Sequence, residues 1–186
     1  MTITVDSRRR SPAALERRHP GAVLLDVTST SEQPWVAFSP FYPHGDIPVP
    51  YSPGVTSQSV EGIWQALKVF ERADVDPSKL AVTSMKGIKR TVRRYGRVLG
   101  HREGLAGIRL LPYVEARRRI YLPAYLWVLE FKVPDLVDEL RLLASERDVV
   151  LLDYTTNSDI GDTRTPLSHA ALVKRDVEGQ WPTDSA

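Results

Sequence analysis

The chain has 186 residues, of which 42% are hydrophobic and 26% charged, values typical of one globular domain. It contains no cysteine, which excludes disulfides and cysteine nucleophiles. No apolar run is long enough to cross a bilayer, and the N-terminal segment lacks the apolar stretch of a secretory signal. We therefore expect a soluble, cytoplasmic protein with no membrane partner. Because the four histidines are widely spaced and match no zinc-ligand pattern, we predict no metal and no cofactor.

The net charge of +2 conceals an uneven distribution. Residues 79–119 hold twelve Lys or Arg against two Glu, a net charge of +10. Residues 120–186 have a net charge of −6 and residues 1–78 one of −2. Such a basic segment indicates an anionic partner but carries no information about the fold.

The apolar periodicity and the turn residues predict the elements in chain order. A short helix is expected over 11–20, a strand over 22–29 and a second candidate strand over 35–39. A loop over 40–54 holds five of the fourteen prolines, which exclude regular helix. Helices are then expected at about 58–72, 84–96, 114–131 and 134–146, with Pro123 kinking or splitting the third. A strand over 148–155 and a helical segment over 167–175 close the chain.

These elements predict an α+β fold, mainly helical, in which a single compact domain packs its helices against a small β-sheet. Residues 1–34 supply a helix and a strand joined to the core, which spans 35–178. Residues 179–186 are expected to form a flexible tail.

The predicted helix over 58–72 has two different faces. Its core-facing stripe consists of four apolar residues: Val60, Ile63, Leu67 and Phe70. Glu61, Gln65 and Lys68 share another stripe, and Trp64 lies at the border between the two. Glu61 therefore sits beside the core near the start of the helix, where the preceding loop could fold over it.

Two interpretations of Glu61 follow from its position. Ser57 or Ser59 can cap the helix, and a glutamate in the first turn is favoured by the helix dipole alone. A carboxylate enclosed by the loop would instead suit catalysis. The second interpretation requires that the Glu61 side chain faces an enclosed site and not bulk water.

The predicted helix over 84–96 places six cations on one face, with Met85, Ile88 and Val92 on the opposite side. These cations are Lys86, Lys89, Arg90, Arg93, Arg94 and Arg97. Like charges at these spacings repel one another mildly, so phosphate is a natural partner. A solvated face without a ligand is the alternative.

One stretch resembles a known family. "FSPFYP", a spacer and then "SVEGIWQALK" resemble the signature of the NADAR domain superfamily. "LPYVEARRRIYLPAYLWVLEF" resembles the middle helix of that family, and "VVLLDYTTNSDIGD" its late strand with an acidic loop. "PLSHAALVKR" stands in place of the closing helix, so the resemblance covers roughly residues 35–175. It implies a NADAR-like domain over 35–178.

The resemblance also implies an activity. Members of the family cleave the bond between ribose and a base in riboflavin-pathway intermediates or in ADP-ribosylated guanine. Glu61 matches the catalytic glutamate of the family, and its late aspartate falls on Asp159 with an offset of one residue. Asn157 and Asp162 are the alternatives for that late position. The chain departs from the family at Pro40, Val114 and Ile160, where the family has an asparagine and two tryptophans; Tyr113 is the aromatic residue nearest the missing middle one.

Chemistry assigns further candidate roles. Cleaving an N-glycosidic bond builds positive charge on the sugar, so a carboxylate such as Glu61 both stabilises that charge and activates water. Asp159 or Asp162 could hold the ribose hydroxyls, or could simply cap a turn. Trp64, Phe41 and Tyr42 could stack on a base or pack in the core. His44 could protonate the leaving base, or be an ordinary loop histidine.

Two functions remain open from the sequence. The first is an N-glycosidase for a phosphorylated ribosyl or ADP-ribosyl small molecule or a modified nucleic acid. It would use Glu61 and Asp159 for catalysis and would bind substrate through a larger set: Phe41, Tyr42, His44, Trp64, Lys68, Lys89, Arg90, Arg93, Arg94, Tyr113, Asn157 and Asp162. The second is a non-catalytic module that binds a nucleotide or nucleic acid through the basic helix over 86–97.

Overall fold

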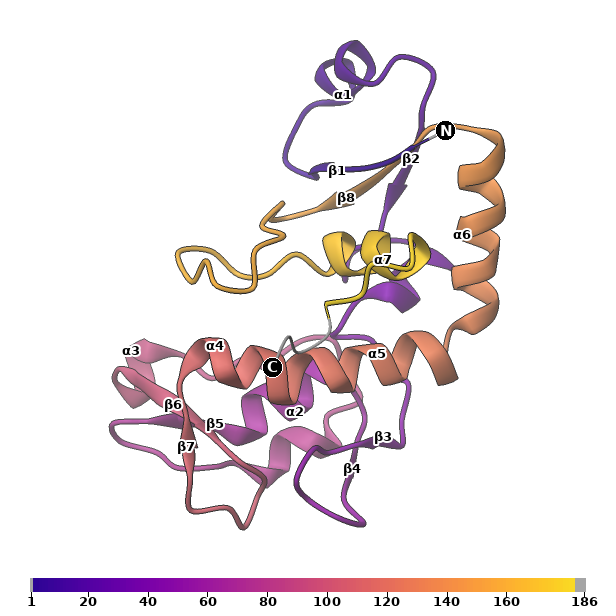
Figure 1. Cartoon of the computed structure of the whole chain (residues 1–186). Coiled ribbons are helices and arrows are strands. Elements are labelled where there is room, and N and C mark those ends of the chain that lie inside the picture. The colour runs from indigo at the N-terminus through magenta and orange to yellow at the C-terminus, as the bar shows by residue number, and fades with distance from the viewer. Residues whose placement is uncertain (1, 183–186) are drawn as a thin grey trace. The chain divides into compact units, whose positions relative to one another are not determined.

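The computed structural model describes residues 2–182 and shows an α+β protein (Figure 1). The chain divides into two compact units, one formed by residues 1–39 with 133–186 and the other by residues 40–132. The first unit joins distant parts of the chain, because a strand from the later part pairs with two strands near the N-terminus. Residues 183–186 of the predicted tail lie outside the described part of the chain.

The first unit contains a parallel sheet of three strands in the order β1-β8-β2. These strands are β1 (Ile3–Ser7), β8 (Val149–Asp153) and β2 (Val23–Asp26). All five residues of β8 are buried, as expected for a central strand that is covered on both faces. The predictions of β2 and β8 are confirmed. The strand β1 was not predicted, because its sequence ITVDS alternates apolar and polar residues over only two apolar positions.

Helices cover both faces of this sheet (Figure 1). On one face α1 (Pro12–Arg18) packs Leu15 against Val150 and Leu152. On the other, α7 (His169–Val177) contacts β1 and β8, and α6 (Pro134–Glu146) contacts α7. The predicted strand over 35–39 is wrong, because Trp35–Phe38 forms the 3₁₀ helix η1. Ala37 N–H donates to the Pro34 carbonyl at 3.1 Å, and Ser39 N–H donates to the Val36 carbonyl at 2.9 Å.

The second unit is built around α2 (Val60–Leu67), whose eight residues are all buried. The predicted helix over 58–72 is too long at its C-terminal end, because Lys68 is extended and begins strand β5 (Lys68–Phe70). This strand pairs with β6 (Val98–Arg102), which in turn pairs with β7 (Leu110–Leu111). Cross-strand pairing therefore overrides the helical period after Leu67.

The predicted helix over 84–96 is mostly wrong, since only α3 (Val92–Tyr95) is helical. Gly87 has φ +74°, a conformation outside the helical region. The main-chain N–H of Arg90 donates to the side chain of Gln65 at 2.9 Å, so the chain is held here by a tertiary contact. The six predicted cations consequently do not form one helical face.

The last helical stretch of the second unit has three parts: α4 (Tyr113–Ala116), a π-helical turn η3 (Arg117–Tyr121) and α5 (Leu122–Phe131). The predicted interruption at Pro123 is confirmed. Because proline has no N–H to donate to the carbonyl four residues earlier, the wider π turn precedes it. The helix α5 contacts β3 (Ile47–Pro48), which pairs with β4 (Thr56–Ser57). The 3₁₀ helix η2 (Pro77–Ala81) contacts α2.

Among residues 2–182, no helix combines the length and the apolar character that crossing a membrane requires.

Candidate active site around Glu61

The proline-rich loop is attached directly to the first turn of α2. Ser59 caps the helix, since its hydroxyl accepts a hydrogen bond from Gly62 N–H at 3.0 Å. The main-chain N–H of Glu61, also in the first turn of the helix, donates to the carbonyl of Pro40 at 2.8 Å. An N–H at a helix start has no partner within the helix, so the "FSPFYP" segment satisfies one that would otherwise be unpaired. This bond explains why the loop and the acid lie together.

The Glu61 side chain is buried, with 8% of the residue exposed. Its Oε1 accepts a hydrogen bond from Gln65 Nε2 at 2.8 Å. The other end of the same amide, Gln65 Oε1, accepts from Arg90 N–H at 2.9 Å. Because a main-chain N–H can only donate, this bond fixes the orientation of the amide and points its NH₂ group at Glu61. The carboxyl group is thus buried and held in one orientation.

Burial and the charges of two lysines act in opposite directions on the pKa of the carboxyl group. Burial raises the pKa of Glu61 above 4.5, although the Gln65 hydrogen bond and the charges of Lys68 and Lys89 oppose the rise. Burial likewise lowers the pKa of Lys68, with Lys89 and Arg90 adding to the effect and Glu61 opposing it. Since burial disfavours the charged form of each group, the two pKa values move toward each other.

Aromatic rings surround this group of charges. Trp64 is buried, and its ring lies 3.7 Å from that of His101 and 5.5 Å from that of Tyr113. Lys68 Nζ lies 5.8 Å from the Trp64 ring, and Lys89 Nζ lies 5.1 Å from the ring of Phe41. One face of Trp64 is therefore covered by His101, whereas Phe41 is half-buried.

His101 belongs to the site but was not selected from the sequence. His101 is fully buried, and neither nitrogen of its ring has a hydrogen-bond partner within residues 2–182. Burial and the charge of Lys68 hold the pKa of His101 well below 6.5, so the ring is neutral at neutral pH. His101 pairs with Lys68 across β5 and β6, and this register between distant segments is not visible in the sequence.

The other aromatic candidates of the loop lie next to each other. The rings of Tyr42 and His44 are 4.7 Å apart, and His44 N–H donates to the Tyr42 carbonyl at 3.0 Å. Gly45 N–H in turn donates to the Gln58 carbonyl at 3.0 Å. This part of the loop is therefore an ordered turn that leads from Phe41 back toward the start of α2.

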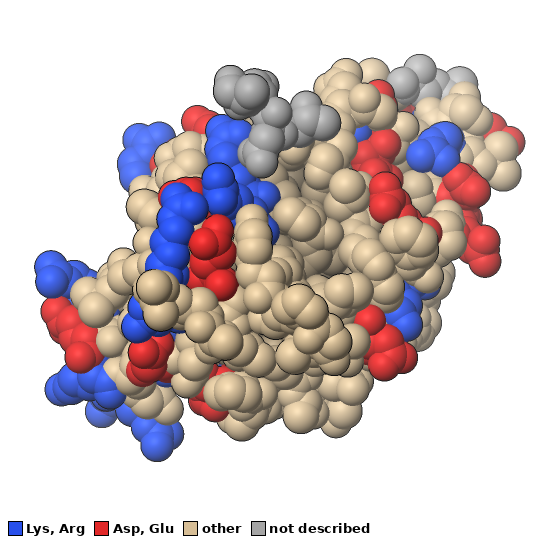
Figure 2. Space-filling model, turned by 60° about the horizontal axis from the view of Figure 1, so that its bottom comes forward, with Lys and Arg blue, Asp and Glu red and all other residues tan. Residues whose placement is uncertain are grey.

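The predicted cationic stripe does not exist as one surface. Arg90 is buried, and its guanidinium donates to three carbonyls, those of Gln65, Lys68 and Asp74. Arg93 and Arg94 are exposed on α3, and Arg97 pairs with Glu71. Figure 2 shows Lys and Arg side chains interleaved with Asp and Glu on one side of the face it draws. Of the six cations, Lys89 is the one that contacts the Phe41 ring and acts on Glu61.

The contacts of Arg90 predict a structural role. Arg90→Lys is expected to destabilise the protein by about 2 kcal/mol, because an ammonium group cannot reach three separated carbonyls with the guanidinium geometry. The matched change at the exposed Arg93, Arg93→Lys, is expected to alter stability by less than about 0.5 kcal/mol. Urea unfolding of both variants measures the difference. Equal stability of the two variants would contradict the assignment.

The late acidic loop belongs to the first unit. Asp159 is exposed, and its Oδ1 accepts from Gly161 N–H at 2.8 Å. Asp162 forms an ion pair with Arg164 at 2.8 Å. Asn157 Nδ2 donates to the carbonyls of Asp162 and Thr165. Hydrogen bonds of this kind stabilise the conformation of a loop. None of these bonds connects Asn157, Asp159 or Asp162 to Glu61.

The first unit contains a buried pair of an aspartate and a histidine at the end of β8. Asp153 Oδ2 lies 3.1 Å from His169 Nδ1 and accepts from the Ser168 hydroxyl at 2.8 Å. His169 Nε2 lies 2.8 Å from the Val27 carbonyl, which can only accept, so this nitrogen carries a proton. Burial tends to lower the pKa of His169, but Asp153 and Val27 outweigh it and raise that pKa above 6.5. The pKa of Asp153 is lowered, since the same contacts overcome its burial.

Within residues 2–182 no three His, Asp or Glu side chains are grouped so that they could hold a metal ion. Fold and site together define an α+β protein with a buried glutamate whose pKa is influenced by the charges of two lysines. A family model described as a family of unknown function (DUF6939) matches residues 7–173, and the chain belongs to this family. No match was found among curated proteins.

Proposed function

We propose that this protein is an N-glycosidase that hydrolyses the ribose–base bond of a phosphorylated ribosyl or ADP-ribosyl substrate. The observation that carries the proposal is the buried Glu61 carboxyl group, oriented by Gln65 and placed within the fields of Lys68 and Lys89. The resemblance of the loop and helix sequence to the NADAR domain superfamily supports the same chemistry.

In the proposed reaction Glu61 acts as a carboxylate. The bond between the anomeric carbon and the base nitrogen breaks, and its electron pair leaves with the base. The positive charge that remains on the sugar is stabilised by the Glu61 carboxylate. Glu61 then takes a proton from the attacking water, whose oxygen bonds to the anomeric carbon. That proton passes to the departed base, so the products are a free base and a ribose with a hydroxyl group.

The remaining residues bind the substrate. Phe41, whose ring lies under Lys89 Nζ, offers a face for the base, and Tyr42 lies beside it in the loop. The ammonium groups of Lys89 and Lys68 provide charge for the phosphate. In this arrangement Arg90 and Gln65 position the machinery and do not contact the substrate.

The test is incubation of the intact protein with a panel of ribosylated compounds and measurement of the released base. The panel contains pyrimidine ribosyl phosphates, ADP-ribosylated guanine and free ADP-ribose. Release of a base from at least one phosphorylated compound, with no release from its dephosphorylated form, is the expected result. Absence of base release across the panel would overturn the proposal.

The raised pKa of Glu61 predicts the acid side of the pH profile. Because the carboxylate is the active form, kcat/KM is expected to fall as the pH drops through a pKa that lies above 4.5. Lys68→Met removes a positive charge that favours the carboxylate, so this limb should move to higher pH. Lys132→Met, which changes a lysine beside Trp127, is the control and should leave the limb in place. A limb at or below pH 4.5 would contradict this role.

A further inference from the structure

The strand β1 leaves one edge of the parallel sheet unpaired within residues 2–182, because β8 is its one strand partner there. Val149 N–H donates to the Thr2 carbonyl at 3.0 Å, and Arg8 N–H donates to the Asp153 carbonyl at 2.8 Å. Since residues along a strand alternate in the side to which their N–H and C=O point, the even-numbered residues face β8. The N–H and C=O groups of Ile3 and Val5 therefore point away from the sheet.

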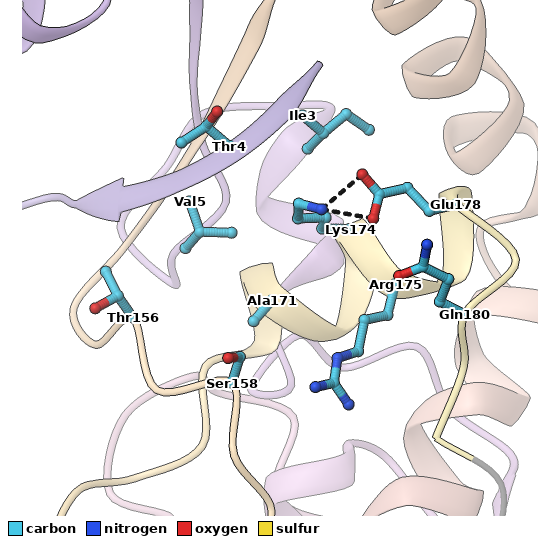
Figure 3. A pocket seen from close by; sticks show the side chains of 10 residues that line it. All are labelled: Ile3, Thr4, Val5, Thr156, Ser158, Ala171, Lys174, Arg175, Glu178 and Gln180. Carbon is cyan, nitrogen blue, oxygen red and sulfur yellow. Dashed lines mark hydrogen bonds and ion pairs between the residues drawn. The ribbon is translucent and has the colours of Figure 1, made fainter.

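A groove of about 390 Å³ lies between this edge and α7 (Figure 3). Its apolar side is formed by Ile3 and Val5 of β1 and by Ala171 of α7. Three charged residues line the other side: Lys174 and Arg175 of α7, and Glu178, which follows the helix. A row of main-chain donors and acceptors without a strand partner, beside an apolar groove, is the arrangement by which sheet edges bind extended peptides.

The charges of the groove determine which side chain would suit it. Lys174 Nζ is paired with Glu178 at 2.5 Å, and Figure 3 shows these two side chains facing each other. The Arg175 guanidinium points away from that pair, and within residues 2–182 it has no ion pair. The lining therefore carries one uncompensated positive charge, which complements a carboxylate.

We propose that the β1 edge and this groove bind an extended, acidic segment of a partner protein as a fourth strand of the sheet. The main chain of the segment bonds to Ile3 and Val5, alternate apolar side chains enter the groove, and one Asp or Glu pairs with Arg175. This surface lies in the first unit and shares no residue with the proposed glycosidase site.

The probe is a displayed library of nine-residue peptides with a central aspartate and randomised flanking positions, selected against the intact protein. Selected peptides are expected to slow hydrogen exchange at the amides of Ile3 and Val5. Every second residue of the bound peptide directs its N–H toward β1. N-methylation of those residues should abolish binding, because it blocks the edge that faces β1. N-methylation of the residues between them should leave binding in place.

Two variants of the protein test the same contacts. Val5→Pro removes an outward N–H while leaving the bonds to β8 intact, since the Val5 N–H points away from the sheet, and should weaken binding about tenfold. Val5→Thr keeps that N–H and is the matched control. Arg175→Glu should reverse the preference from peptides with a central aspartate to peptides with a central lysine. The melting temperature of each variant is compared with that of the unchanged protein.

Three outcomes would overturn the proposal. One is that no peptide of the library binds, and a second is that both methylation patterns are tolerated equally. The third is a dimer in which the amides of Ile3 and Val5 are protected without any peptide, because a second copy of the chain would then occupy the edge. The methylation experiment uses unchanged protein, so its result does not depend on the folding of a variant.

Discussion

Glu61→Gln is expected to reduce the rate of ribose–base cleavage by about 10²- to 10⁴-fold, the contribution typical of a general base. The change removes the negative charge but keeps the shape of the side chain, and the amide can still meet the Gln65 side chain after rotation. Because burial opposes the charged form of Glu61, the neutral variant should fold at least as stably. Single-turnover rates with the most active compound of the panel, together with urea unfolding, measure both effects.

The matched control for this change is Glu71→Gln, in the same unit. Glu71 is exposed and pairs with Arg97 at the surface, so its replacement should leave the rate unchanged. Loss of activity in both variants would indicate a general effect of charge and not catalysis. Full turnover by Glu61→Gln would remove Glu61 from the mechanism.

Asp153→Ala is expected to destabilise the protein by about 3–5 kcal/mol, the cost of removing one partner of a buried ion pair. The substitution leaves His169 without its carboxylate partner and removes the acceptor of the Ser168 hydroxyl. Urea unfolding at pH 6 measures the loss. Asp138→Ala removes an exposed ion pair with Arg141 on α6, and as a control it should cost less than about 1 kcal/mol.

The pH dependence of this loss distinguishes an ion pair from simple packing. The folded pKa of His169 lies above its ordinary 6.5, so its contribution to stability is complete below pH 6.5 and is lost as the pH rises through the folded value. The folded pKa of Asp153 lies below its ordinary 3.8, so its contribution is present above pH 3.8 and is lost at lower pH. The cost of Asp153→Ala should therefore be largest between these two pH values. A cost that does not vary with pH would contradict the ion pair.

Segments with a strong local pattern were predicted well. The helix over 134–146 has the predicted bounds, because its apolar period and its N-terminal proline are both local signals. The strand β8 lies within the predicted segment over 148–155, as expected for a short, continuous apolar run. Ser59 was likewise one of the two predicted caps of the helix that carries Glu61.

The basic segment shows why some features could not be predicted from local sequence patterns. The spacing of its cations fits a helical face, but Gly87 and the bond from Arg90 to Gln65 hold most of the segment in an irregular conformation. Arg90 is thereby buried against carbonyl groups from three separate positions. A pattern of charges cannot reveal that one of its members is needed inside the protein, because that depends on acceptors distant in the chain.

The sequence by itself determined the α+β class, the position of Glu61 near the start of a helix and the loop that precedes it. These depend on local periodicity, capping and proline content, which act over a few residues. Only the tertiary structure decided that Gln65 orients the acid, that Lys68 leaves the helix to face His101, and that the two ends of the chain share one sheet. The physical reason is that burial and strand register depend on contacts between distant segments, and these contacts set the pKa values on which the proposed chemistry depends.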